Sequence, residues 1–169
     1  MSEHNDKQSH AYDQMLERTK EFISDLGRET QPHLEKATRY AKEKAVELGE
    51  LTREEADDIA KYLQRDIHDA ATFLGEHGDD IKDWLRLDLL LIENKLLDMF
   101  SQVVDKTRLE LDQIAMQADA QGWHTGQIAG IGTLQCLNCG EELHFHKTGR
   151  IPPCPKCSHT EFNRINKDG

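Results

Sequence analysis

Apolar residues recur at helical spacing in the first part of the chain, in segments separated by glycine or proline. The spacing predicts one helix over 11–26, before Gly27, and a second over 32–48, with a narrow inner stripe of alanines. A third helix is predicted to begin at the capping box of Thr52 and Glu55 and to end before Gly75. Its nearly regular apolar stripe indicates core packing and consists of Ala56, Ile59, Leu63, Ile67, Ala70 and Leu74.

The fourth predicted helix is long and apolar over a wide arc. It spans 79–120, about 60 Å if continuous, and its arc runs from Ile81 to Val104. A face this wide requires two neighbouring elements. We therefore expect an antiparallel helical bundle or a coiled-coil region, with a homodimer through the helical region as one way to cover the arc.

Beyond residue 132 the period changes from helical spacing to alternation. Residues 142–146 alternate, which places Leu143 and Phe145 on one face of a strand and His144 and His146 on the other. The two histidines could bind a second metal weakly, but a solvated strand face is the commoner case. Gly149 predicts a turn, and residues 160–165 predict a last strand.

All four cysteines of the chain fall in this last part, in two Cys-x-x-Cys pairs. Each pair lets one tight turn direct two thiolates at a single ion, and the second pair completes a tetrahedral site. We therefore predict a metal centre at Cys136, Cys139, Cys154 and Cys157. Two disulfides fit less well because no secretory signal is visible. A redox dithiol fits less well because it requires one such pair at a strand-to-helix turn, and not two facing pairs. Zinc is expected over iron.

A three-stranded β zinc ribbon of this size depends on its metal. About 35 residues cannot form a sufficient apolar core, so metal binding and ribbon folding should be inseparable. Loss of one cysteine should then unfold the ribbon and leave the helices largely intact.

The predicted fold is mainly α, with a disordered tail over 1–10, an acidic helical region over 11–121, a Gly-rich connector over 122–132 and the ribbon over 133–166. His124 in the connector is expected to be structural or solvated.

Charge divides the chain at the same place. Residues 1–132 carry 16 Lys and Arg against 28 Asp and Glu, a balance of −12, whereas residues 133–169 carry 5 against 4, a balance of +1. Neither part offers the positive surface that nucleic-acid phosphates require, so nucleic acid is disfavoured as a partner. No run reaches the roughly 18 apolar residues of a membrane span. We expect a cytoplasmic protein that does not associate with membranes.

Several short runs resemble the YbeL-like family of bacterial zinc-ribbon proteins. They lie at 50–55, 105–110, 124–126 and 130–136, and the similarity extends over about residues 12–165. The resemblance implies an acidic helical region followed by a C-terminal zinc ribbon and supports the four metal ligands, but it implies no activity. The N-terminal tail departs from the family pattern, as does Ser158, where the family more often has glycine.

Three classes of function are compatible with this architecture. We favour a non-enzymatic protein-interaction or regulatory module, without catalytic or cofactor-binding residues other than a structural zinc site. A rubrerythrin-like redox protein with iron is an alternative, but no histidine before the ribbon follows a Glu by three positions, as a di-iron bundle requires. The second alternative is a regulator that associates with RNA polymerase or nucleic acid. A protein partner could bind the basic ribbon tip at Lys147 and Arg150, the histidine face or the acidic helices.

Overall fold

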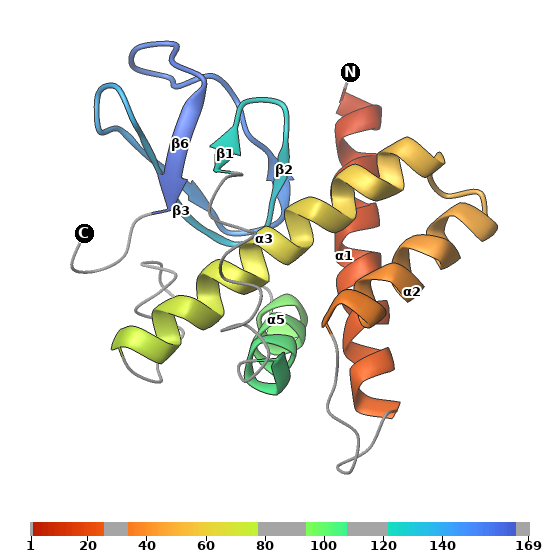
Figure 1. Cartoon of the computed structure of the whole chain (residues 1–169). Coiled ribbons are helices and arrows are strands. Elements are labelled where there is room, and N and C mark those ends of the chain that lie inside the picture. Colours follow the sequence, from red (N-terminus) through yellow and green to blue (C-terminus); the bar gives the residue numbers. More distant parts are fainter. Residues whose placement is uncertain (1, 26–33, 78–93, 108–121, 165–169) are drawn as a thin grey trace.

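A computed structural model describes residues 2–25, 34–77, 94–107 and 122–164 of the chain (Figure 1). Within this part the chain is mainly α-helical and ends in small antiparallel sheets. The helices are α1 (Ser2–Asp25), α2 (Leu34–Glu47), α3 (Arg53–His77) and α5 (Asn94–Thr107). The predicted helix 79–120 is described only over α5, and the remainder of that prediction lies outside the described residues. None of the described helices meets the length and apolarity that a membrane crossing requires.

Local sequence signals account for where the helices begin. The predicted capping box is present at α3, because the Thr52 amide donates to Glu55 Oε2 at 2.9 Å and the Glu55 amide donates to Thr52 Oγ1 at 3.1 Å. The start of α1 differs from the expectation, since the segment 1–10 was predicted as a disordered tail and is helical from Ser2 onward. Tertiary contact explains the difference, because Gln8 in this segment accepts a hydrogen bond from Arg150 of the ribbon.

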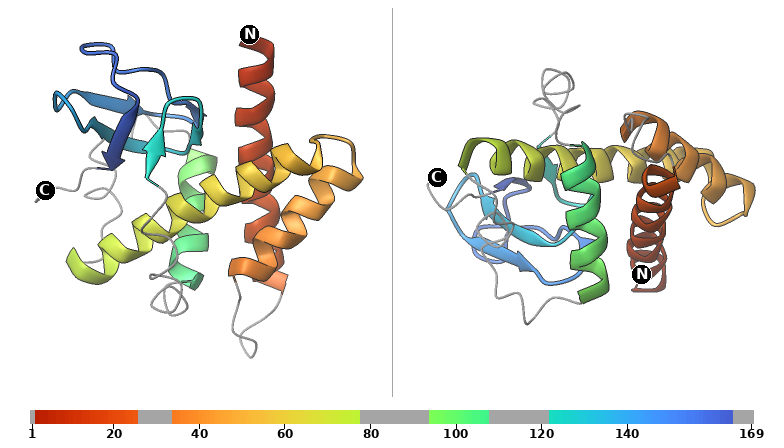
Figure 2. Two further views of the ribbon diagram at one scale, coloured as in Figure 1. Left: turned by 45° about the horizontal axis from the view of Figure 1, so that its top comes forward. Right: turned by 90° about the horizontal axis from the view of Figure 1, so that it is seen from below.

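The helices pack as crossed layers. In Figures 1 and 2, α3 crosses α1 obliquely and α2 lies beside α1, so the helices do not share the common axis of an antiparallel bundle. Their interior contains the predicted α3 stripe from Ala56 to Ala70, whereas the Leu74 side chain lies outside the described part of the chain. Part of the wide arc is buried there through Leu96, Phe100 and Val104. Arg18 of α1 ties this packing to the turn before α3 through two hydrogen bonds of 2.7 Å to Glu50.

The ribbon contains a four-stranded sheet instead of the predicted three strands. Its order is β1-β6-β3-β4, and a second sheet pairs β2 with β5. The additional strand comes from the connector, where Trp123 pairs with Phe162 at the edge of β6 and is held there by a hydrogen bond to α3. The strands are β1 (Trp123–His124), β2 (Ile128–Ala129), β3 (Gly132–Cys136), β4 (Glu142–Phe145), β5 (Gly149–Arg150) and β6 (Glu161–Arg164).

The ribbon and the helices share an interior. Ile128 and Ile131 of the expected connector belong to the buried cluster of the helices. The ribbon tip also contacts α1, because Thr148 Oγ1 donates to Asp13 and Arg150 donates to Gln8. The predicted connector, residues 122–132, is therefore the segment through which the ribbon and the helices pack on each other (Figure 2).

Candidate metal centre

The first cysteine pair lies at the end of β3 and in the loop after it, and the second pair lies in the loop before β6. In Figure 1 these loops are at the end of the ribbon that faces away from α3. The four Sγ atoms all lie within 4.8 Å of one another, and the Cys136–Cys157 and Cys139–Cys154 sulfurs are each 3.5 Å apart. Tetrahedral zinc with Zn–S bonds of about 2.3 Å would separate its sulfurs by about 3.8 Å. The donor type, the number of donors and their spacing therefore fit one thiolate-bound ion.

Two matching backbone turns position the cysteines. In each turn an amide donates to the carbonyl of the first cysteine: Gly140 N to Cys136 O at 3.1 Å, and Ser158 N to Cys154 O at 2.8 Å. The residue after each pair takes a left-handed conformation, with φ of +80° at Gly140 and +65° at Ser158. Glycine adopts this conformation without strain and serine does not. The Asn138 amide also points at Cys136 Sγ, at 3.4 Å.

The pKa values of two of the thiols, Cys139 and Cys157, are shifted in opposite directions. Hydrogen bonding by Asn138 and by the backbone of His159 lowers the pKa of Cys157 to about 6. The backbone of Glu141 favours the Cys139 thiolate, but burial and the neighbouring sulfurs outweigh it and raise the pKa of Cys139 to about 12. A cation that binds all four thiolates must displace protons, so its affinity must fall as the pH falls.

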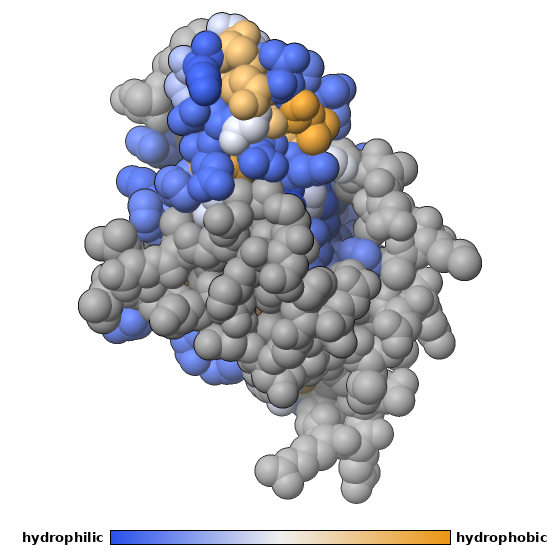
Figure 3. All heavy atoms as spheres, turned by 90° about the vertical axis from the view of Figure 1, so that its left-hand side faces the viewer, coloured by the Kyte–Doolittle hydropathy of each residue, from blue (hydrophilic) through white to orange (hydrophobic). Residues whose placement is uncertain are grey.

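The centre is partly accessible from outside. Cys136 and Cys154 are buried, whereas Cys139 and Cys157 are half-buried. Leu137, between the cysteines of the first pair, is 54% exposed. Figure 3 shows a small apolar patch on the ribbon, surrounded by hydrophilic side chains.

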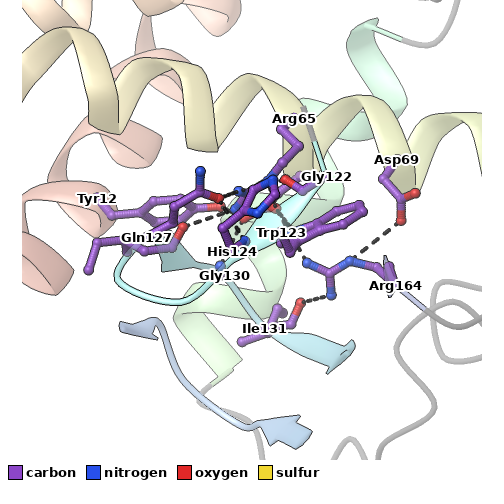
Figure 4. A network of polar contacts seen from close by, with 12 residues as sticks. Tyr12, Arg65, Asp69, Gly122, Trp123, His124, Gln127, Gly130, Ile131 and Arg164 are labelled. Atoms are coloured by element: carbon purple, nitrogen blue, oxygen red, sulfur yellow. Dashed lines mark hydrogen bonds and ion pairs between the residues drawn. The ribbon is translucent and has the colours of Figure 1, made fainter. Parts of the chain in front are cut away.

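A second polar centre lies at the opposite end of the ribbon, against α3, and sequence reasoning missed it (Figure 4). At its middle is the fully buried carboxylate of Asp66. This carboxylate accepts hydrogen bonds from the Tyr12 hydroxyl at 2.7 Å, the Trp123 indole at 2.9 Å and the Gly130 amide at 2.8 Å. The Asp66 network, as we call it, comprises Tyr12, Arg65, Asp66, Trp123 and Arg164.

Two arginines complete the Asp66 network. Arg65 Nε donates to Asp66 at 3.1 Å, and Arg164 of β6 forms an ion pair with the same oxygen at 3.4 Å. Both guanidinium groups also lie over the Trp123 ring, 5.0 and 5.2 Å from its centroid, which favours a cation–π contact. Arg65 also donates to the Ile128 carbonyl, and Arg164 donates to the Ile131 carbonyl. Arg164 Nε faces Asp69 Oδ2 at 3.5 Å.

The network is electrostatically consistent although it is buried. Burial alone would raise the pKa of Asp66, but the two guanidinium groups and the hydrogen bonds from Gly130 and Tyr12 outweigh burial and lower it. Burial, together with the neighbouring Asp66 charge, raises the pKa of Tyr12 well above its ordinary value. The carboxylate is therefore charged and the phenol neutral at neutral pH.

The histidines singled out in the sequence lie outside the cysteine centre. His124 is in β1, and its amide donates to Gln127. His144 is exposed, and its ring contacts Thr133 and Glu142. Among the described residues, the cysteines form the only group of three or more side chains placed to hold an ion, so His144 and His146 gain no third ligand there.

Comparison with known proteins agrees with the ribbon architecture. The family described as a zinc-ribbon containing domain matches residues 21–166. The uncharacterized protein YbeL of Escherichia coli strain K12 is 31% identical over 75 residues, as is its counterpart in the O157:H7 strain. These matches cover 44% of this chain and 47% of each relative, so the alignment spans about half the length of the curated relatives. No solved structure matches the chain.

Proposed function

The chain belongs to this zinc-ribbon family, and on that premise we propose that it is a non-enzymatic protein-interaction or regulatory module with one structural zinc ion. The ligands in this proposal are Cys136, Cys139, Cys154 and Cys157. The single observation that carries it is the convergence of four sulfurs within 4.8 Å. Because these ligands must stay reduced, the proposal assigns the protein to a reducing compartment such as the cytoplasm.

A structural role for the metal follows from the donor set. Four thiolates fill the tetrahedron, whereas catalytic zinc keeps an open position for water or substrate. The first cysteine turn also directs the Asn138 backbone amide at Cys136 Sγ, which stabilises the thiolate that a metal ion requires. We therefore propose no reaction for this centre.

Fewer surfaces remain available for a partner than the sequence suggests, because part of the basic ribbon tip is bonded within the chain. Arg150 of the basic tip donates to Gln8 and to the Gly126 carbonyl, and Thr148 beside it donates to Asp13. This engagement, with the −12 balance of residues 1–132, supports a protein partner over a nucleic acid. The exposed cysteine turns and the acidic helices remain as candidate surfaces, and a homodimer through the helical region remains a prediction.

Metal analysis of the purified full chain tests the proposal. Chain prepared anaerobically, without added metal, should contain about one zinc per chain by elemental analysis. The Cys154→Ser variant should contain much less, and the His144→Ala variant, which leaves all four sulfurs in place, should match the wild type. Iron in place of zinc would support the redox alternative, and a chain without metal would contradict the proposal.

A further inference from the structure

The Asp66 network depends on residues that the ribbon supplies. Three of the five groups around the Asp66 carboxylate come from residues 122–164, namely the Trp123 indole, the Gly130 amide and the Arg164 guanidinium. The other two, from Tyr12 and Arg65, come from the helices. The most deeply buried charge of the helical region therefore relies mainly on the ribbon for its partners.

Those partners are held in place by the strands that join the two cysteine pairs. Arg164 lies on β6, which begins four residues after Cys157, and Trp123 pairs with Phe162 on the same strand. β6 in turn pairs with β3, where Cys136 lies opposite Phe162. If the cysteine centre comes apart, the small apolar core of the ribbon cannot hold β6 and β3 together. Trp123 and Arg164 then lose their positions.

The helices cannot keep their arrangement without these partners. A buried carboxylate that loses a guanidinium and two hydrogen bonds is strongly destabilised where it stands, and hydrating it requires opening the contact between α1 and α3. The same movement removes Ile128 and Ile131 from the helical interior. Gly130 also leaves Tyr12, which it approaches so closely that a Cβ would lie 2.6 Å from the hydroxyl.

We propose that the cysteine centre is a lock on the helical region: with its metal bound, the Asp66 network holds α1 and α3 closed, and loss of the metal opens them and exposes their apolar faces. This inference rests on the proposed zinc site. It differs from the sequence-based expectation that the helices stay largely intact when the ribbon unfolds. Metal occupancy of the cysteine centre then controls whether the apolar residues of the α1–α3 interface are buried or exposed.

Hydrogen–deuterium exchange of the full chain, followed by mass spectrometry, tests the lock. The purified protein would be compared as prepared, after removal of metal by a chelator under reducing conditions, and after addition of zinc chloride. Removal should speed exchange in residues 56–70 of α3 and 8–24 of α1 by tenfold or more, and zinc should reverse the change. Faster exchange confined to residues 122–164 would overturn the lock.

A second variant tests whether the effect travels through the network. Asp66→Asn leaves all four cysteines in place, so the variant should retain its metal. Amide exchange in its α1 and α3 should already be faster than in the wild type before metal removal, and the chelator should speed it little further. The matched control is Asp57→Asn of the same helix, whose side chain is 43% exposed and makes no contact with the Asp66 network, and it should behave as the wild type. A chelator response in Asp66→Asn equal to that of the wild type would contradict the lock.

Metal content, measured on the same samples, separates the two proposals. A chain that contains zinc but whose helices ignore its removal would overturn the lock alone. A chain that contains no metal would overturn the proposed function and the lock with it.

Discussion

The ribbon has a polar centre at each end, and the two are built on opposite principles. The cysteine centre is formed by residues within one stretch, 136–157, and half of its ligands are partly exposed. The Asp66 network is buried, and apart from the adjacent Arg65 it joins Asp66 to residues 54 to 98 positions away in the chain. One centre is organised by local turns that bring four sulfurs together, and the other by tertiary contacts around a carboxylate.

This difference shows how a ribbon too small to be stable alone can be supported from both sides. The proposed zinc ion would hold its outer end, and the Asp66 carboxylate of α3 bonds its inner end. Each support is polar, and each requires several parts of the ribbon to be in place at once. Substitutions in one centre, followed by measurements of stability and metal binding, test whether the two centres depend on each other.

Asp66→Asn should have the largest effect on stability. A neutral amide cannot satisfy two buried guanidinium groups, and breaking a buried ion pair costs about 3–5 kcal/mol in the free energy of unfolding. Urea unfolding of the metal-loaded protein measures it. Asp57→Asn, whose side chain is 43% exposed and pairs with Lys42, should change stability by less than about 0.5 kcal/mol.

The same variant carries a pH signature. Because the pKa of Asp66 is lowered in the folded state, its contribution is fully present above the unfolded-state pKa of about 4. The contribution disappears as the pH falls through the lower folded-state pKa. The cost of Asp66→Asn should therefore be constant from pH 6 to 8, and a cost that varies strongly over this range would argue against the assignment.

Gly132→Ala should have the next largest effect, because it disturbs Arg164. Gly132 has φ of +139°, and a Cβ there would lie 1.7 Å from the Arg164 guanidinium, which would have to move. Gly126→Ala is the matched control, with φ of +94° and no heavy atom within 4 Å of the added Cβ. The control should cost about 1–2 kcal/mol from backbone strain, and Gly132→Ala about 1–3 kcal/mol more. Equal costs would mean that Arg164 does not hold the ribbon.

Tyr12→Phe should have an intermediate effect. It removes one donor from the buried carboxylate while leaving the ring in place, which should cost about 1–3 kcal/mol. Thermal unfolding would compare it with Tyr40→Phe, whose ring is 39% exposed and whose hydroxyl is expected to matter little. A larger cost for Tyr40→Phe would place the critical contact between α1 and α2 instead.

Ser158→Gly should have the smallest effect and the opposite sign. It relieves the left-handed strain at the second cysteine turn, so it should stabilise the metal-loaded ribbon by about 0.5–1 kcal/mol. The reverse test is Gly140→Ala in the first turn, which should destabilise it by about 1–2 kcal/mol. Competition with a chromogenic chelator measures both. No change in either variant would show that the turns tolerate strain without affecting the centre.

Sequence reasoning succeeded where a signal is local. The capping box at Thr52 and the α3 stripe depend on spacing within one helix, and the structure has the box and the stripe from Ala56 to Ala70. The cysteine prediction likewise depends only on two short turns, and the structure places the four sulfurs within 4.8 Å of one another. The family match agrees with the zinc-ribbon architecture.

The Asp66 network was missed because its members look ordinary one by one. In an acidic chain, an aspartate beside an arginine resembles a solvated pair. One signal was available, since Asp66 lies three residues after Leu63 and four before Ala70, on the buried stripe itself. No sequence pattern could have paired it with Arg164, because that contact depends on how the ribbon packs on α3.

The separation of Asp66 and Arg164 by 98 positions sets an order of events during synthesis. At about 5–20 residues per second, Asp66 leaves the ribosome roughly 5–20 seconds before Arg164 does. The nascent helices thus spend that interval with a carboxylate whose ribbon partners have not yet been made. Their final packing becomes a late step, completed only after the last strand has emerged.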